Sequence, residues 1–126
     1  MKRLRITSQT GHFGEILGID DRITHNTPPI STVIGMLKVI FGEEIEKEEF
    51  ILGYTFKSKV KFLDDIIIYK HNTSGYTRET KNSPITTDCR SIENHYDCEL
   101  LIYTDLDKEI EMKYALCMGK SGNPAR

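Results

Sequence analysis

The sequence predicts an α+β fold, in which an antiparallel sheet has helices on one face. Residues 2–9 and 49–63 alternate apolar and polar side chains, which is typical of half-buried strands. Residues 31–41 repeat apolar side chains at helical spacing, and residues 98–104 form a further apolar run. Helices can cover one face of an antiparallel sheet and leave the other face open.

The composition fits one domain of an ordinary soluble protein. The chain has 126 residues, of which 38% are hydrophobic and 29% are charged, and this length suits a single domain. Its apolar runs are far shorter than a membrane span. The basic start MKRLRIT is not followed by the apolar run of a signal peptide. We therefore expect one domain, residues 1–126, in the cytoplasm.

The charge is unevenly distributed. A net charge of −2 argues against a dedicated nucleic-acid-binding domain with a basic surface. However, five of the 19 acidic residues lie in Glu43–Glu49, and without this segment the chain has 16 basic and 14 acidic residues. We expect a solvated acidic loop, which leaves another face free to be basic.

The first strand, Lys2–Gln9, points Leu4 and Ile6 to one face and Arg3 and Arg5 to the other. The following residues, 10–27, have no sustained period and contain three glycines, so they are predicted to form a loop. Arg22 and His25 lie in this loop, just before two prolines.

The central helix follows the prolines. Pro28 and Pro29 hold its approach extended, Ser31 is the expected N-cap, and Gly42 is placed to end it. Gly35 is unusual, because a glycine inside a helix costs about 1 kcal/mol relative to alanine. Two interpretations remain open at this point: a tolerated flaw or tight packing contact, or close backbone approach by another chain.

The strand Glu49–Leu63 shows the clearest alternation. It aligns three lysines on one face, about 7 Å apart, namely Lys57, Lys59 and Lys61. They form either a solvated face or, together with the arginines of the first strand, a basic patch. A turn at Asp64–Asp65 and a returning strand, Ile66–Lys70, are predicted next.

The remaining chain is predicted to hold a long loop, a strand and a small C-terminal unit. The polar stretch His71–Asp88 is expected to be a mobile hairpin tip or long loop. After the core strand Cys98–Thr104, we expect a short helix over Asp105–Lys113, with Leu106, Ile110 and Met112 turned inward, and a last strand over Tyr114–Met118. Gly119–Gly122 then forms a flexible loop rich in backbone donors.

This order of elements describes a ferredoxin-like, RRM-type fold. The open sheet face of RRM domains holds RNA, although their usual aromatic pair on the central strands is not evident here. The three cysteines, Cys89, Cys98 and Cys117, imply no disulfide framework. Cys89, His95 and Cys98 match no common zinc spacing, so we expect no metal and no cofactor.

Three segments resemble a known family. The string PPISTVIGMLKVIFG is similar to the P-P-x-S-T/A-x-x-G segment of the CRISPR-associated Cas-five family, of the RAMP superfamily. CELLIYTDL resembles the strand after that family's thumb, and LCMGKSGNPAR resembles its glycine-rich loop, with lysine in place of arginine. Type I-B members are the most similar. The resemblance implies a ferredoxin-like domain with a thumb over about residues 70–97 and a glycine-rich loop over residues 119–122. Family members usually continue beyond this loop, so the chain is either compact or truncated.

The resemblance also implies a function. Cas-five proteins bind the 5′ handle of CRISPR RNA and cap one end of the Cascade surveillance complex, where they contact the Cas-seven backbone subunit and the Cas-eight large subunit. The expected RNA-binding residues combine this resemblance with the basic positions: Arg3, Arg5, Arg22, His25, Ser31, Thr32, Gly35, Lys38, Lys57, Lys59, Lys61, Gly119, Lys120, Ser121 and Gly122. Tyr76, Arg78 and Lys81 are expected in the thumb.

Two alternatives remain. One branch of the family cuts precursor CRISPR RNA without metal, and Lys70, His71 and His25 are the weak candidates for such acid–base chemistry. Most type I systems assign cleavage to a separate subunit, so we expect no enzyme activity. The second alternative is a ferredoxin-like module that binds protein only.

Overall fold

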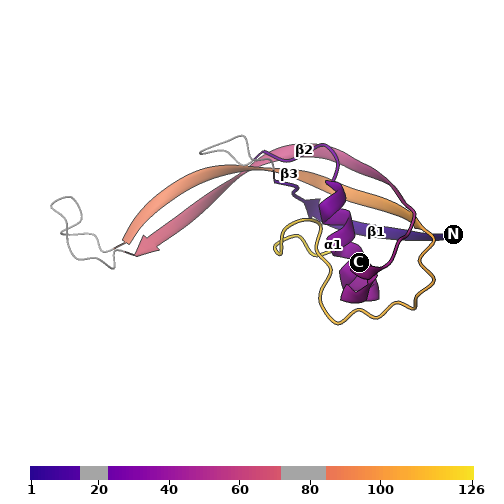
Figure 1. Ribbon diagram of the computed structural model, residues 1–126. Coiled ribbons are helices and arrows are strands. Elements are labelled where there is room, and N and C mark those ends of the chain that lie inside the picture. The colour runs from indigo at the N-terminus through magenta and orange to yellow at the C-terminus, as the bar shows by residue number, and fades with distance from the viewer. Residues whose placement is uncertain (15–22, 72–84) are drawn as a thin grey trace.

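The computed structural model describes residues 1–14, 23–71 and 85–126, with the side chains of residues 70–71 and 85–86 left aside. The elements are β1 (Lys2–Gly11), α1 (Ile30–Phe41), the short 3-10 helix η1 (Glu43–Lys47), β2 (Leu52–His71) and β3 (Ile85–Thr104). The strands form one antiparallel sheet in the order β1-β3-β2. Figure 1 shows α1 and the C-terminal chain on one side of this sheet. The predicted α+β fold is confirmed.

The C-terminus takes the place of a fourth strand. Ala125 forms an antiparallel bridge with Ser8. The backbone N–H groups of Thr7 and Arg126 donate to each other's carbonyl oxygens at 2.8 and 3.0 Å. The C-terminal residues therefore lie on the free edge of β1, so that the first strand has the last segment on one side and β3 on the other. This is the neighbour order of a ferredoxin-like sheet.

Helix α1 begins two residues earlier than the expected start at Thr32 and lacks the expected cap. Its N-cap is Pro29, which is extended (φ −60°, ψ 152°), and no side chain caps the helix. The Ser31 N-cap is wrong because the proline pair itself sets the extended entry, which leaves Ser31 exposed in the first turn. Gly42 ends the helix as predicted: its φ is 98°, and its N–H donates to the Lys38 carbonyl at 2.8 Å.

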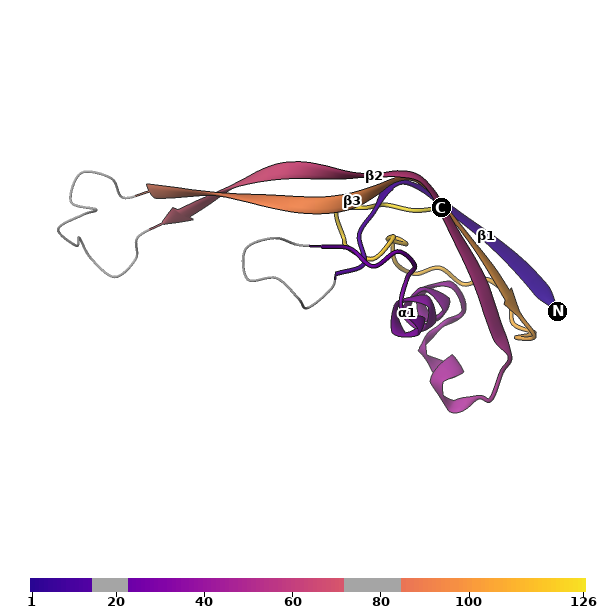
Figure 2. The same cartoon turned by 90° about the horizontal axis from the view of Figure 1, so that it is seen from above.

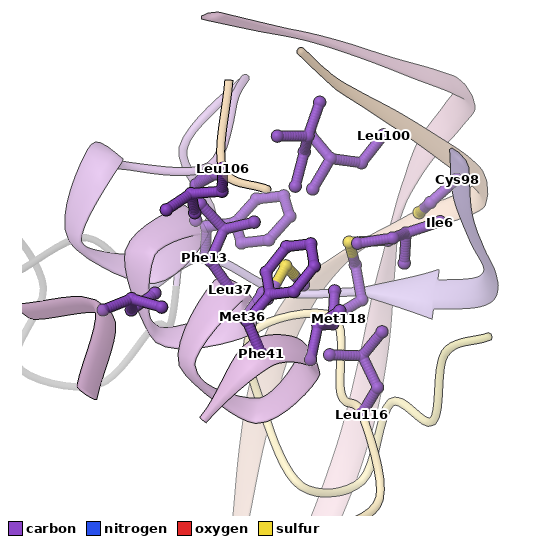
Figure 3. Packing of buried hydrophobic residues seen from close by; sticks show 14 residues of the cluster. Ile6, Phe13, Met36, Leu37, Phe41, Cys98, Leu100, Leu106, Leu116 and Met118 are labelled. Atoms are coloured by element: carbon purple, nitrogen blue, oxygen red, sulfur yellow. The ribbon is translucent and has the colours of Figure 1, made fainter. Parts of the chain in front are cut away.

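The core lies between α1 and the sheet. Figure 3 shows Met36, Leu37 and Phe41 of α1 facing Ile6 and Leu100 of the sheet. Leu106, Leu116 and Met118 join this cluster from the C-terminal chain. The core residues expected from the first two strands and the helix are all in the cluster or pack against it: Leu4, Ile6, Val33, Leu37, Ile40, Leu52, Tyr54 and Phe56.

The acidic segment is more ordered than expected. It folds into η1, and its one apolar side chain, Ile45, is buried in the core cluster. The prediction of a solvated loop is wrong for the backbone and for Ile45, because this single side chain anchors the turn. The glutamates themselves are exposed, as expected.

Strands β2 and β3 form one long hairpin. The predicted turn at Asp64–Asp65 is wrong, because these residues stay in β2 and pair with Ile92 and Ser91. The β-branched run that follows them favours continued strand, so the predicted returning strand is the outer half of β2. Strand β3 correspondingly begins at Ile85, inside the expected thumb loop. Figure 1 shows both strands projecting well beyond the helix layer. The expected site residues Arg22, Tyr76, Arg78 and Lys81 lie outside the described residues.

Asp97 changes which side chains of the sheet point toward α1. Its φ of 55° lies in the left-handed region, and the strand ladders omit its pairs with Gln9 and Lys59. After Asp97 the buried residues of β3 begin with Cys98, whereas before it His95 is buried. The buried parity of β3 therefore changes between Cys98 and His95, on either side of Asp97, although Ile92 farther out is again a buried even-numbered residue. Figure 2 shows the sheet bending near this level, beside the C-terminus.

The switch breaks the predicted lysine stripe. All three lysines are exposed as expected. However, Lys61 Nζ lies 3.8 Å from Glu93 Oε1, and the same carboxylate oxygen accepts from the Thr24 N–H at 3.3 Å. Lys61 thus turns toward the loop that leads to α1, whereas Lys57, next to the inward-facing Phe56, points away from α1. The expectation of one face for all three is wrong, because the ladder between β2 and β3 is interrupted where Lys59 lies opposite the left-handed Asp97.

The C-terminal chain lacks the predicted secondary structure. Residues 105–116 form an extended loop instead of the short helix over 105–113, and side chains bind its backbone: Thr104 Oγ1 accepts from the Leu106 N–H and Lys2 Nζ donates to the Lys108 carbonyl. Leu106 is buried as expected, but Ile110 and Met112 are exposed, which corrects their assignment to the core. The predicted last strand is reduced to a single bridge between Cys117 and Pro124.

Candidate nucleic-acid interface

The open face of the sheet carries the basic residues of β1. Arg3 and Arg5 alternate with the inward-facing Leu4 and Ile6, so they lie on the face away from α1. Arg5 Nε donates to Glu99 Oε2 of β3 at 2.7 Å. Because the Arg5 side chain is two-thirds exposed, this ion pair holds its orientation without removing it from solvent.

An aromatic residue of the central strand was missed by the sequence analysis. Tyr103 pairs with Arg3 on one side and with Gly53 on the other, so its ring lies on the open face between a cation and a residue without a side chain. It is half-buried. Aromatic rings beside cations on an exposed sheet are stacking platforms for nucleic-acid bases. The sequence feature that could have identified Tyr103 is its odd-numbered position in a strand whose even-numbered residues face the core.

The glycine-rich loop is tightly built. The Met118 N–H donates to the Asn123 carbonyl at 2.8 Å, and the Asn123 N–H donates to the Lys120 carbonyl at 2.9 Å. Gly119 has φ 91°, and a Cβ there would lie 1.9 Å from the His12 carbonyl oxygen. Gly119 is therefore required by the fold itself. Gly122 is exposed, and a Cβ there would meet nothing within 4 Å.

A cavity of about 540 Å³ joins this loop to the edge of β1. Gly122 and Arg126 line one wall, the strand segment 7–10 lines another, and Asp97 lies at its end. The hydroxyl of Thr10 donates to Asn123 Oδ1 at 2.7 Å, which ties the loop to the strand. The structure thus unites the glycine loop with the bend in the sheet.

The glycine loop and the entry to α1 lie against the same short segment. Gly119 faces His12 and Phe13, and the His25 N–H donates to the Phe13 carbonyl at 2.7 Å. Figures 1 and 2 both show the C-terminal loop beside the segment that leads into α1. Ser31 is exposed and Thr32 is half-buried in the first turn of that helix.

Buried histidines hold this region together. Nε2 of His95 lies 2.7 Å from the His25 carbonyl, which can only accept, so in the neutral ring Nε2 donates and Nδ1 accepts from the Ser58 hydroxyl at 2.8 Å. His12 Nδ1 lies 2.6 Å from the Glu93 carbonyl. Both rings are buried, so these histidines position the loop and are not available to a substrate.

Of the three free cysteines, Cys98 is buried and unsuited to reactive chemistry. Burial raises the pKa of the Cys98 thiol, which keeps it protonated. Across residues 1–14, 23–71 and 85–126, no group of three or more His, Cys, Asp or Glu side chains could hold a metal ion. Lys70 and His71 are the last residues of β2, and their side chains are not among those that the structure describes.

Gly35 opens onto a groove rather than a packing contact. A Cβ at Gly35 would meet nothing within 4 Å, which excludes tight packing inside the described chain as its reason. The groove has a volume of about 630 Å³ and is also lined by Glu43, Glu44 and Glu111. Lys38, on the same helix, forms an ion pair with Glu46. Three carboxylates and two lysines line the groove, and both lysines are in ion pairs, so this surface is unfavourable for phosphate.

Replacing Gly35 with alanine should therefore stabilise the protein. We expect the free energy of unfolding to rise by about 1 kcal/mol, since alanine is the better helix former and its methyl group has space. Urea denaturation measures the change. The control is Gly42→Ala, where the space is equally open but φ is 98°, so that substitution should destabilise by about 1 kcal/mol. A loss of stability in Gly35→Ala would contradict the open groove.

The geometry above was compared with known proteins. No protein family matches the chain, and no curated protein matches it. A solved structure does match: a chain of a CRISPR RNA-guided surveillance complex superposes with a TM-score of 0.62. The two chains share one fold. The match covers 95% of this chain at 16% sequence identity, and 57% of the surveillance-complex chain. This chain thus spans little more than half of that neighbour. None of the helices described here is long and apolar enough to span a membrane.

Proposed function

We propose that this chain is a non-catalytic subunit of a type I CRISPR Cascade complex, in which it binds the 5′ handle of CRISPR RNA and caps the complex in antiviral defence. The observation that supports this most is the fold shared with a surveillance-complex chain over 95% of the present chain. The similarity of the proline-helix segment and the glycine loop to the Cas-five family, closest to type I-B, supports the finer assignment.

The long hairpin supports a place in an assembly. Its outer half is a two-stranded ribbon, which is marginal in water by itself. Several of its apolar side chains are exposed: Leu63, Ile66, Ile67 and Tyr69. Exposed apolar groups that gather on one element mark contact surfaces. In the proposed complex, Cas-seven and Cas-eight subunits would cover this ribbon and the domain.

The RNA interface would combine the open sheet face with the glycine loop. Arg3 and Arg5 supply charge for phosphates, and Tyr103 supplies a ring for base stacking. Lys57, Lys59 and Lys120 would add charge, and the exposed amides near Ser121 and Gly122 suit phosphate oxygens. Helix α1 offers Ser31 and Thr32 at its positive end. The charges are few, so assembly partners must supply much of the affinity.

Cleavage is not part of the proposal. Metal-independent RNA cleavage by the 2′-hydroxyl needs one group to deprotonate that hydroxyl and another to protonate the leaving oxygen. The two most buried histidines, His12 and His95, are used in hydrogen bonds that hold the fold. We expect the purified chain to leave a CRISPR repeat RNA intact. Site-specific cleavage that survives EDTA and is lost in His71→Ala would support the nuclease alternative instead.

RNA affinity measured against salt tests the proposed interface. We expect Arg5→Ala to reduce the slope of log affinity against log salt by about 1, the effect of one phosphate contact. Tyr103→Ala should weaken binding by about 1–3 kcal/mol without changing the slope, because stacking is not ionic. Tyr114→Ala is the matched control, since Tyr114 is exposed and lines a groove together with three glutamates. Equal effects at Tyr103 and Tyr114, or no salt dependence at all, would favour the protein-only module.

A further inference from the structure

The groove beside Gly35 lies next to the segment that replaces a helix. A ferredoxin-like fold has a second helix between its third and fourth strands. Here residues 105–116 occupy that part of the chain as an extended loop, anchored by buried Leu106 and Leu116 at its ends. The Glu111 N–H donates to the Ile40 carbonyl at 2.8 Å, which holds the loop against the end of α1. The loop and α1 border a groove of about 630 Å³.

The groove combines an apolar floor with acidic walls. Gly35 and Val39, one turn apart on α1, form part of the floor, and the absent side chain at Gly35 deepens it. Glu43, Glu44 and Glu111 line the walls. These walls are part of a larger acidic surface at one end of the molecule, because residues 43–49 and 105–113 together contain nine acidic residues and three lysines.

The two lysines of the groove are already paired. Lys38 forms an ion pair with Glu46, and Lys113 Nζ lies 3.4 Å from Glu111 Oε1. Within the described part of the chain, neither Glu43 nor Glu44 has an ion-pair partner. Both follow directly on the C-terminal end of α1, where the helix dipole is negative and disfavours further negative charge. A cation supplied by another molecule would offset the repulsion between the helix dipole and each of these two glutamates.

The loop beside the groove exposes apolar side chains in a regular pattern. Ile110, Met112 and Tyr114 alternate with charged residues and are 63%, 54% and 74% exposed. Tyr114 also lines the groove. Three large apolar side chains exposed on one short segment are a contact surface for protein and not for phosphate.

We propose that this groove binds a segment of a partner protein that presents arginine or lysine beside a large apolar side chain. The apolar side chain occupies the space over Gly35, between Val39 and Tyr114. The cation reaches Glu43 and Glu44, and the exposed loop covers the segment. This gives Gly35 a role in protein contact, on the side of the molecule that faces away from the open sheet. The inference does not depend on RNA binding by the sheet.

Nuclear magnetic resonance titration of the full chain with three synthetic pentapeptides tests this. One alternates leucine with arginine, one alternates glycine with arginine, and one alternates leucine with glutamate. We expect the leucine–arginine peptide to shift the amide signals of Gly35, Val39 and Gly42. The glycine–arginine peptide should bind about tenfold more weakly, because it buries no apolar side chain. The leucine–glutamate peptide should cause no shift.

Two variants locate the binding. Gly35→Leu fills the groove and should weaken the leucine–arginine peptide about tenfold or more. The double variant Glu43→Gln, Glu44→Gln keeps the shape of the groove and should remove most of the salt dependence of peptide binding. This variant still tests the proposal if Gly35→Leu does not fold. The proposal is overturned if the leucine–arginine peptide leaves the groove signals unchanged, or if folded variants bind it undiminished. It is equally overturned if the leucine–glutamate peptide or a uridine oligonucleotide shifts the same signals.

Discussion

Gly119→Ala should lower the free energy of unfolding by about 3 kcal/mol or more, the largest effect expected from a glycine-to-alanine change among the described residues. Two causes add together. The backbone of Gly119 has φ 91°, which L-residues rarely adopt, and the new Cβ would lie 1.9 Å from the His12 carbonyl oxygen. Since that oxygen belongs to backbone, it cannot rotate away, and the loop must separate from residues 12–13.

Urea denaturation and the protection of loop amides against hydrogen exchange measure this change. Gly122→Ala is the control, because it adds the same methyl group three residues later, where nothing lies within 4 Å. Its effect should stay within about 0.5 kcal/mol, as at most surface sites. If the two substitutions cost the same, the close approach of the loop to His12 is wrong.

His95→Ala should cost about 3 kcal/mol for a different reason. The ring is 1% exposed and makes two hydrogen bonds, to the His25 carbonyl and the Ser58 hydroxyl. It also packs against Phe13 and Phe56, with ring centroids 5.8 and 5.0 Å away. The substitution leaves buried polar atoms without partners and opens a cavity between two aromatic rings.

The neighbouring Tyr96→Ala is the control for His95. Tyr96 is half-exposed and has one ring contact, with Phe62 at 6.4 Å, so its loss should cost about 1 kcal/mol. Thermal unfolding followed by circular dichroism distinguishes the two. Equal losses would mean that His95 is not the link between the hairpin and the entry to α1.

The sequence was most informative where periodicity met buried apolar residues. The apolar faces of β1, α1 and the inner half of β2 were predicted correctly because each alternation or helical repeat faces the same core. The C-terminal end of α1 was predicted because Gly42 can adopt a positive φ. These are local rules, and in each case the tertiary structure agrees with them.

The errors fall where a distant contact overrides a local pattern. The two aspartates in β2 suggested a turn, but 19 residues of β3 pair with that strand and continue the ladder through them. The left-handed Asp97 gives no strong local signal, yet it reverses the facing of the sheet and divides the lysines between two surfaces. The helix expected over residues 105–113 was lost because distant groups bind that backbone: Lys2 Nζ donates to the Lys108 carbonyl, and the Ile40 carbonyl accepts from the Glu111 N–H.

The candidate site was predictable only in part. The arginines of β1 follow from alternation, whereas Tyr103 becomes a site residue only when the pairing places it beside Arg3. Gly35 was correctly singled out as unusual, and of the two explanations the structure excludes packing within the described chain. The kind of group that approaches Gly35 depends on the carboxylates of η1 and of Glu111. The fold brings these carboxylates together from separate parts of the sequence.

The most direct test of the proposed function is crosslinking within an assembled Cascade complex. A CRISPR RNA with a photoreactive base in its 5′ handle would be bound and irradiated, and the crosslinked peptides would be identified. We predict crosslinks to this chain in the peptides that contain Tyr103 and the glycine loop, and their loss when the photoreactive base is moved to the other end of the RNA. Handle crosslinks found only in other subunits, with this chain present in the complex, would contradict the account.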